Sequence, residues 1–137
     1  MRLITKVIIH CAATKPSMDI GASEIKKWHL DRGWKDIGYH YVIRRNGDIE
    51  NGIAVALAGS HTKGHNANSI GICLVGGIND KGEPESNFTK AQWATLERLV
   101  RVLKVDFPHA TVHGHREFAA KACPSFDVQE WLKNKGI

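Results

Sequence analysis

Three residues of types that bind metals are spread along this chain: His10, His115 and Cys123. Two imidazole nitrogens and one thiolate sulfur can fill three corners of a zinc tetrahedron and leave the fourth corner for water. Three protein ligands with an open position are typical of catalytic zinc sites, whereas structural sites usually have four. If these side chains meet in space, the sequence predicts a metal-dependent hydrolase.

The spacing of these residues leaves alternatives open. They are far apart in the sequence and form no finger-like ligand pattern, so three side chains without a shared role are equally compatible with it. His113 also competes with His115, because side chains two residues apart on a strand share a face. His113 is therefore either a ligand in place of His115 or a hydrogen-bond partner of that residue.

Lys121 and Tyr39 are candidates for catalysis without metal binding. Lys121 lies two residues before Cys123. A thiolate ligand lowers the positive charge of the metal and so weakens its attraction for an oxyanion. The nearby ammonium of Lys121 would restore that attraction. Tyr39 begins a predicted strand, and its hydroxyl could donate to an oxyanion or orient an attacking water. The plainer alternatives are an exposed surface lysine and a packed strand aromatic.

The elements that would position these residues follow from the pattern of apolar and polar residues. Strands are predicted at residues 6–10, 39–45, 48–51, 70–75 and 111–113, with Asn46-Gly47 as a hairpin turn. Helices are predicted at residues 22–32, at 90–105 and from Asp127 to the residue before Gly136. The pattern predicts an α/β fold with a single domain over residues 1–137. In this fold a central mixed sheet of about five strands is flanked by about three helices.

Side-chain burial can be predicted within the helices. In the first helix, Ile25 and Trp28 are expected to form the buried stripe and His29 to lie in solvent. Thr89 and Gln92 form a capping box that begins the long second helix. The apolar face of that helix is expected to carry Trp93, Leu96, Leu99, Val100 and Leu103.

The composition is that of a soluble domain with a mildly basic surface. The 137 residues carry a net charge of +5 without a block of consecutive Lys and Arg, so nucleic acid is not an expected partner. Three cysteines without regular spacing favour a reducing compartment over a disulfide framework. No stretch is apolar enough for a signal peptide or a membrane span. We therefore expect a cytoplasmic monomer that does not bind membranes.

Four segments together resemble the zinc-dependent N-acetylmuramoyl-L-alanine amidases, whose fold is shared by the peptidoglycan recognition proteins. The segments are residues 9–16 (IHCAATKP), 38–40 (GYH), 68–77 (NSIGICLVGG) and 121–126 (KACPSF). The resemblance covers almost the whole chain, from about His10 to the last predicted helix. It implies that His10, His115 and Cys123 hold one Zn²⁺ per chain, with His115 preferred to His113. It also implies that Tyr39 and Lys121 are catalytic and do not bind the metal.

The same resemblance implies a function. It points to a phage-type endolysin that hydrolyses the amide bond between N-acetylmuramic acid and L-alanine in peptidoglycan and so causes bacterial lysis. We expect His61 and Asn66, in the polar loop at residues 58–69, to contact the substrate. An enzyme of this type is made in the host cytoplasm and would reach the cell wall through a membrane lesion, without a signal peptide of its own.

Other functions are kept as alternatives. In one phage member of the family an N-terminal arm helps to bind and inhibit the phage RNA polymerase, but only nine residues precede His10 here. Non-catalytic peptidoglycan-binding modules usually lack the cysteine ligand, so Cys123 argues against that function. A zinc deaminase would need a Cys-x-x-Cys pair, which Cys123 does not form. Arg116 and Ala120 replace a histidine and a proline of the family pattern, and we expect them to alter loop rigidity rather than the reaction.

Overall fold

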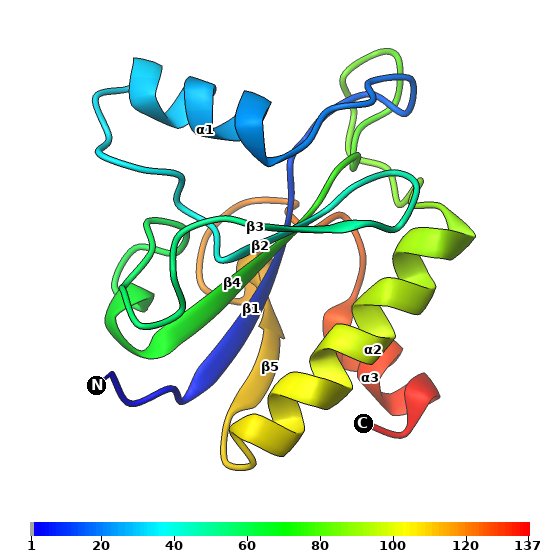
Figure 1. Ribbon diagram of the computed structural model, residues 1–137. Helices are drawn as coiled ribbons and strands as arrows, with labels where there is room; N and C mark the ends of the chain where they lie inside the picture. The colour runs from blue at the N-terminus through cyan, green and yellow to red at the C-terminus, as the bar shows by residue number, and fades with distance from the viewer. Residues whose placement is uncertain (1) are drawn as a thin grey trace.

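A five-stranded sheet forms the centre of the computed structural model, which describes residues 2–137 (Figure 1). Its strands are β1 (Lys6–Cys11), β2 (Tyr41–Ile43), β3 (Ile49–Asn51), β4 (Ser69–Leu74) and β5 (Thr111–Gly114). They lie in the order β3-β2-β4-β1-β5. Strand β3 is antiparallel to β2, and the other neighbouring strands are parallel. The prediction of a mixed sheet with about five strands is confirmed.

Three helices cover this sheet, as predicted. Helices α2 (Lys90–Asp106) and α3 (Val128–Lys135) lie on one face, and α1 (Ala22–Asp31) lies on the other (Figure 1). The larger hydrophobic core lies between the sheet and the α2–α3 layer. A smaller core on the α1 side includes Ile25, Val42 and Cys73. Two single-turn 3₁₀ helices, η1 (Asn66–Asn68) and η2 (His115–Glu117), complete this α/β domain.

The central strand β1 shows how this layering positions His10. Neighbouring side chains of a strand point to opposite faces, so Ile9 belongs to the larger core and His10 lies on the other face. His10 is paired in register with Cys73 of β4, which belongs to the smaller core on the α1 side. Because both faces of the sheet are covered, every residue from Val7 to Cys11 is buried. The imidazole of His10 is therefore held in the interior at the end of a rigid strand.

Helix α1 buries different side chains from those predicted. Ile25 and His29, four residues apart, share the buried face, whereas Trp28 is 37% exposed. Nδ1 of His29 accepts a hydrogen bond from the backbone N–H of Gly38 at 2.9 Å. A buried imidazole is tolerated when its polar atoms are paired. The predictions of a solvated His29 and a buried Trp28 are therefore wrong.

Helix α2 begins as predicted. The hydroxyl of Thr89 accepts from the backbone N–H of Gln92 at 3.1 Å, and the amide oxygen of Gln92 accepts from the backbone N–H of Thr89 at 3.0 Å. This reciprocal pair confirms the capping box. The apolar face packs against the sheet through Leu96, Leu99, Val100 and Leu103, with Trp93 partly buried beside them.

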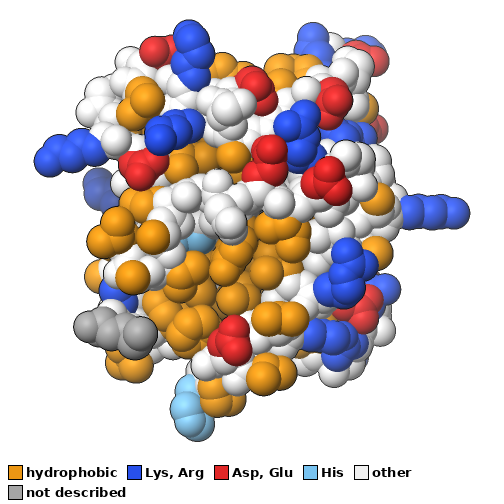
Figure 2. Space-filling view, in the orientation of Figure 1, with side chains coloured by type: hydrophobic (Ala, Val, Ile, Leu, Met, Phe, Trp, Pro, Cys, Tyr) orange, Lys and Arg blue, Asp and Glu red, His pale blue; other side chains and the backbone are white. Residues whose placement is uncertain are grey.

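Charged side chains of both signs are interspersed over the face shown in Figure 2, and hydrophobic side chains gather near its centre. The Lys and Arg side chains of this face are therefore dispersed among acidic ones rather than concentrated in a basic stripe. Within residues 2–137, no helix combines the length and the apolar character that crossing a membrane requires.

Candidate metal centre

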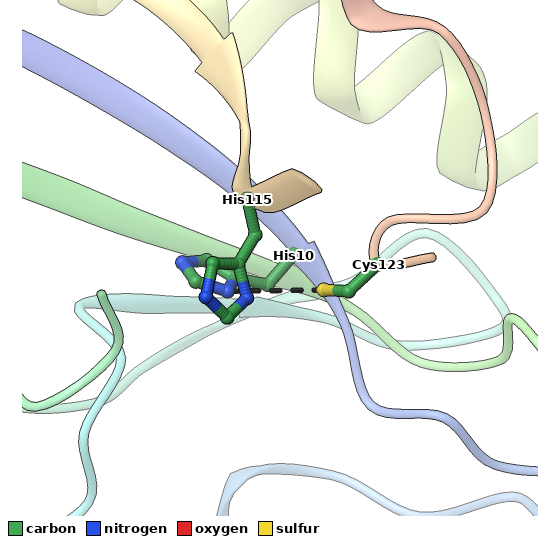
Figure 3. A group of neighbouring side chains, drawn as sticks. All are labelled: His10, His115 and Cys123. Carbon is green, nitrogen blue, oxygen red and sulfur yellow. Dashed lines mark hydrogen bonds between the residues drawn. The ribbon is translucent and has the colours of Figure 1, made fainter. Parts of the chain in front are cut away.

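The structure brings His10, His115 and Cys123 together at one edge of the sheet. His10 lies near the end of β1, and His115 follows directly after β5, the parallel neighbour of β1. Because parallel strands end at the same edge, residues far apart in the sequence meet there. One nitrogen of each histidine and the sulfur of Cys123 all lie within 4.8 Å of one another, and Figure 3 shows these side chains pointing toward a common space.

The loop between η2 and α3 holds Cys123 against the end of β1. The carbonyl of Cys123 accepts from the backbone N–H of Arg116 at 2.8 Å, and its Sγ accepts from the backbone N–H of Cys11 at 3.2 Å. The hydroxyl of Ser125 donates to the carbonyl of Gly77 at 2.8 Å and so ties the loop to the segment after β4. Sγ of Cys123 lies 3.9 Å from Nδ1 of His10, so Nδ1 is the nitrogen of His10 that faces the shared space.

Electrostatics keep the two histidines of this group neutral. Burial lowers the pKa of His10 well below its usual value, and the nearby His61, His115 and Lys121 lower it further. Burial and the charge of Lys121 also lower the pKa of His115. A metal ligand must offer a lone pair, so a neutral imidazole is the form that binds.

Cys123 lies beside a second thiol. Its hydrogen bond with the side chain of Cys11, followed by burial, raises the pKa of the Cys123 thiol. A coordinated divalent cation reverses this preference, because a coordinating thiol is deprotonated. Cys11 is buried and packs within the larger core. It contributes its backbone N–H and its side chain to the surroundings of Cys123.

The donor set fits a borderline-soft divalent metal. Two imidazoles and one thiolate are ligands that zinc prefers, and three protein ligands leave one coordination position open. That position has room for a ligand, because His115 lines a cavity of about 440 Å³ at this edge of the sheet. His113 is used elsewhere: its ring nitrogens contact Glu117 at 2.8 Å and Thr111 at 2.7 Å.

Lys121 and Tyr39 both lie next to this group. Lys121 is exposed and lines the same cavity as His115, and its charge is felt by both histidines. The ring of Tyr39 lies 5.1 Å from that of His10, measured between centroids. Burial, followed by the neighbouring Cys73 thiol, raises the pKa of Tyr39 well above its usual value. The phenol therefore stays protonated and can act as a hydrogen-bond donor.

The two residues predicted to contact substrate have internal partners. His61 is only 7% exposed, and its Nδ1 and Nε2 lie within hydrogen-bonding distance of His10 and Ser69. The amide oxygen of Asn66 accepts from the backbone N–H groups of His61 and Thr62, both at 2.9 Å. Both residues do line the cavity, so substrate contact through them stays a prediction.

Thr62 and Ser69 were missed by sequence reasoning. The hydroxyl of Thr62 lies 3.0 Å from Nδ1 of His61 and 3.3 Å from Nε2 of His10. The hydroxyl of Ser69 lies 3.1 Å from Nε2 of His61. A weak signal was present, because Ser69 and Gly71 put small side chains at alternate positions of a strand that is otherwise bulky and apolar. Such positions leave space on one face for a ring.

An α/β sheet with two histidines and a cysteine grouped at the ends of parallel strands, beside a cavity, defines a candidate metallohydrolase. The family model described as "N-acetylmuramoyl-L-alanine amidase" matches residues 1–126 of the chain. The chain belongs to this family.

Similar proteins include endolysins of two phages. The chain is 50% identical over 133 residues to the endolysin of Klebsiella phage KP32, which covers 97% of this chain and 88% of that protein. It is also 50% identical over 131 residues to the endolysin of Escherichia phage T7, covering 96% of this chain and 87% of that protein. Among solved structures, the N-acetylmuramoyl-L-alanine amidase LysC from Clostridium intestinale superposes with a TM-score of 0.84 at 26% identity. That match covers 98% of this chain and 86% of LysC.

Proposed function

We propose that this protein is a phage-type endolysin, a zinc-dependent amidase that hydrolyses the amide bond between N-acetylmuramic acid and L-alanine in peptidoglycan. The observation that carries the proposal is the grouping of His10, His115 and Cys123, with donor atoms within 4.8 Å of one another beside a cavity. A module that only binds peptidoglycan has no need of a complete ligand set. The amidase family and the phage endolysins at 50% identity give the substrate class.

His10, His115 and Cys123 would hold the zinc ion. When bound, zinc lowers the pKa of its water to near neutrality and polarises a carbonyl oxygen. The protein keeps the two imidazoles neutral through burial and through the charge of Lys121, and it holds the sulfur in place through the N–H of Cys11.

Lys121 and Tyr39 would stabilise the charge that develops on the lactyl carbonyl oxygen. The Lys121 ammonium lies along the cavity, where it can approach that oxygen. The Tyr39 phenol remains protonated because burial raises its pKa, so it can donate a hydrogen bond to the oxyanion or orient water. During hydrolysis the acyl carbon gains the hydroxyl of water, and the departing alanine nitrogen gains a proton.

The cavity suits an anionic peptide attached to a sugar. Among its lining residues within the described range 2–137, none is acidic, while Lys63 and Lys121 are basic. Trp34 and Phe118 supply apolar walls. A positive cavity attracts the carboxylates of a peptidoglycan stem peptide, and aromatic walls can pack against its apolar parts.

The products of peptidoglycan digestion test this function. Digestion by the zinc-loaded protein should create new L-alanine amino termini and no new reducing sugar ends, as measured by mass spectrometry and end-group labelling. A strong chelator should abolish this activity, and added zinc should restore it. The matched control Cys123→Ser keeps the side-chain size and removes the sulfur, and it should be inactive. New reducing ends, or full activity in excess chelator, would show that the proposal is wrong.

A further inference from the structure

We propose that His61 is a positioning residue for the metal centre: it accepts a hydrogen bond from Nε2–H of His10 and so fixes the tautomer and ring orientation in which Nδ1 of His10 faces the metal. This inference rests on the proposed zinc site. It assigns His61 to the support of a ligand rather than to substrate contact alone.

The two nitrogens of His10 have different surroundings. Nδ1 lies 3.9 Å from Sγ of Cys123 and faces the space shared by the three donor atoms (Figure 3). Nε2 points the other way and lies 2.9 Å from Nδ1 of His61. A neutral imidazole carries one proton, and the ligating nitrogen must keep its lone pair. The proton of a ligating His10 is therefore on Nε2, where it points at His61.

The second nitrogen of His61 fixes its own tautomer. If Nδ1 of His61 accepts from His10, its proton is on Nε2, which lies 3.1 Å from the hydroxyl of the fully buried Ser69. The chain of donors then runs from His10 to His61 to Ser69 without a conflict. Metal-bound histidines generally donate their second N–H to a protein acceptor, and loss of that acceptor weakens metal binding.

Packing holds the His61 ring in this position. The ring is edge-on to that of His10, with centroids 4.9 Å apart and an interplanar angle of 88°. It lies directly over Gly71, where an added Cβ would come within 2.6 Å of Cγ of His61. The amide oxygen of Asn66 accepts a hydrogen bond from the backbone N–H of His61 at 2.9 Å, and this bond holds the loop that carries His61. These contacts leave the ring little freedom to turn away from His10.

Thr62 offers a competing acceptor. Its hydroxyl lies 3.3 Å from Nε2 of His10, farther than Nδ1 of His61 at 2.9 Å. The same hydroxyl lies 3.0 Å from Nδ1 of His61, so it can also form a hydrogen bond with that nitrogen. The shorter distance favours His61 as the main acceptor, and a Thr62 variant separates the two cases.

Three variants of the full chain test the inference. His61→Phe keeps a ring but removes the acceptor, His61→Asn restores an oxygen close to the position of Nδ1, and Thr62→Val removes the competing hydroxyl. We expect His61→Phe to bind Zn²⁺ about 10- to 100-fold more weakly in a chelator competition. His61→Asn should recover most of this loss, and Thr62→Val should change the dissociation constant by less than about threefold. Urea unfolding of each metal-free variant separates weaker metal binding from lower stability.

Nuclear magnetic resonance of the imidazole nitrogens provides a measurement that needs no variant. In the zinc-loaded wild-type protein, His10 should carry its proton on Nε2 and His61 should accept at Nδ1. Protonation of His61 at Nδ1, or unchanged zinc affinity in folded His61→Phe, would overturn the inference. A large loss in Thr62→Val alone would assign the role to the hydroxyl instead. If the wild-type protein binds no zinc, the proposed function is wrong as well. If the wild-type protein binds zinc tightly and His61→Phe binds it equally tightly, only this inference is wrong.

Discussion

On the proposed mechanism, Lys121 supplies charge rather than a ligand at the candidate metal centre. A thiolate ligand reduces the net positive charge of the metal site, and a nearby fixed cation restores its pull on an oxyanion. Lys121 meets this need because it lines the cavity and its charge is felt by His10 and His115. Lys63 also lines the cavity, but it has no comparable influence on the two histidines.

We therefore expect Lys121→Ala to lower kcat by about 10²- to 10³-fold, the usual effect of losing one oxyanion-stabilising group. Zinc content should stay at one per chain, because Lys121 is not a ligand. The control Lys63→Ala should lower kcat by less than about tenfold. Peptidoglycan hydrolysis and metal analysis of the same samples measure both effects. Equal losses in the two variants would contradict the specific role of Lys121.

The role of the Tyr39 hydroxyl can be tested by a substitution that removes this group alone. Tyr39→Phe removes the hydroxyl and keeps the ring that lies 5.1 Å from His10, so we expect the fold and zinc binding to be retained while kcat falls at least about tenfold. Tyr41→Phe is the matched control, because Tyr41 packs against the larger core and the charge that acts on its hydroxyl is that of Asp106, at the end of α2. Activity that survives in Tyr39→Phe would remove the hydroxyl from the mechanism.

Residue types indicated the candidate ligands more readily than the buried histidines around them. His10, His115 and Cys123 could be proposed from chemistry alone, and the resemblance selected His115 over His113. The places of His29 and His61 depend on backbone and side-chain partners that only the folded chain supplies. A histidine has both apolar and polar character, so its burial cannot be predicted without those partners.

At the scale of elements, the parallel arrangement of β1 and β5 brings the two histidines of the candidate metal centre together. The sequence predicted both strands and their apolar character, but it could not predict that they are neighbours, because pairing depends on the packing of the whole sheet. The predicted strand at residues 39–45 is shorter in the structure. Nδ1 of His40 accepts from the backbone N–H of Gly71, where a continued strand would use a main-chain carbonyl.

Gln92 joins α2 to the sheet in a way that pattern analysis cannot reveal. Its side chain is fully buried, and its amide nitrogen donates to the carbonyls of Val75 at 2.8 Å and Ile43 at 3.2 Å. Its amide oxygen accepts from the side chain of Arg45 at 3.1 Å and from the backbone N–H of Thr89 at 3.0 Å. A single side chain thus connects the helix start to the ends of β2 and β4.

We expect Gln92→Met to lower the free energy of unfolding by about 2–4 kcal/mol, because several buried polar groups lose their partner. Gln129→Met is the matched control. Gln129 also donates from a helix to a strand carbonyl, that of Val112 at 2.8 Å, but it is exposed, so water can replace the bond. In urea denaturation, the control substitution should lower the free energy of unfolding by less than about 1 kcal/mol. A similar decrease in the free energy of unfolding for both variants would show that the burial of Gln92 is not the reason for its contribution to stability.

At the scale of the whole molecule, buried histidines predict acid sensitivity of the fold. Burial lowers the pKa values of His10, His29, His40 and His61, that of His61 to about 3. In the unfolded chain these groups regain an ordinary pKa of about 6.5. Below that pH the unfolded state binds more protons than the folded state, so the free energy of unfolding decreases as the pH falls from about 6.5 toward 3. Well above a pH of about 6.5 the histidines are neutral in both the folded and the unfolded state, so they no longer make the free energy of unfolding depend on pH.

Urea unfolding of the metal-free protein should therefore give a lower midpoint at about pH 5 than at about pH 7.5. His29→Asn keeps an acceptor for the N–H of Gly38 but removes one titrating group, so its midpoint should depend less on pH. The exposed His109→Asn should behave like the wild type. A midpoint independent of pH, or an unchanged dependence in His29→Asn, would contradict this explanation.

The fold class and the family could be predicted from the sequence, because the element pattern and four motifs span nearly the whole chain. Other predictions at this scale depend on partners outside the molecule. Binding to a phage RNA polymerase, the monomeric state and the route from the cytoplasm to the cell wall stay predictions.

X-ray absorption of the zinc-loaded protein tests the central claim most directly. With one zinc bound per chain, the spectrum should contain one sulfur at about 2.3 Å and two imidazole nitrogens at about 2.0–2.1 Å. In Cys123→Ser the sulfur contribution should disappear. A wild-type spectrum without sulfur, or a sulfur that persists in Cys123→Ser, would contradict the assignment of His10, His115 and Cys123 as the metal ligands.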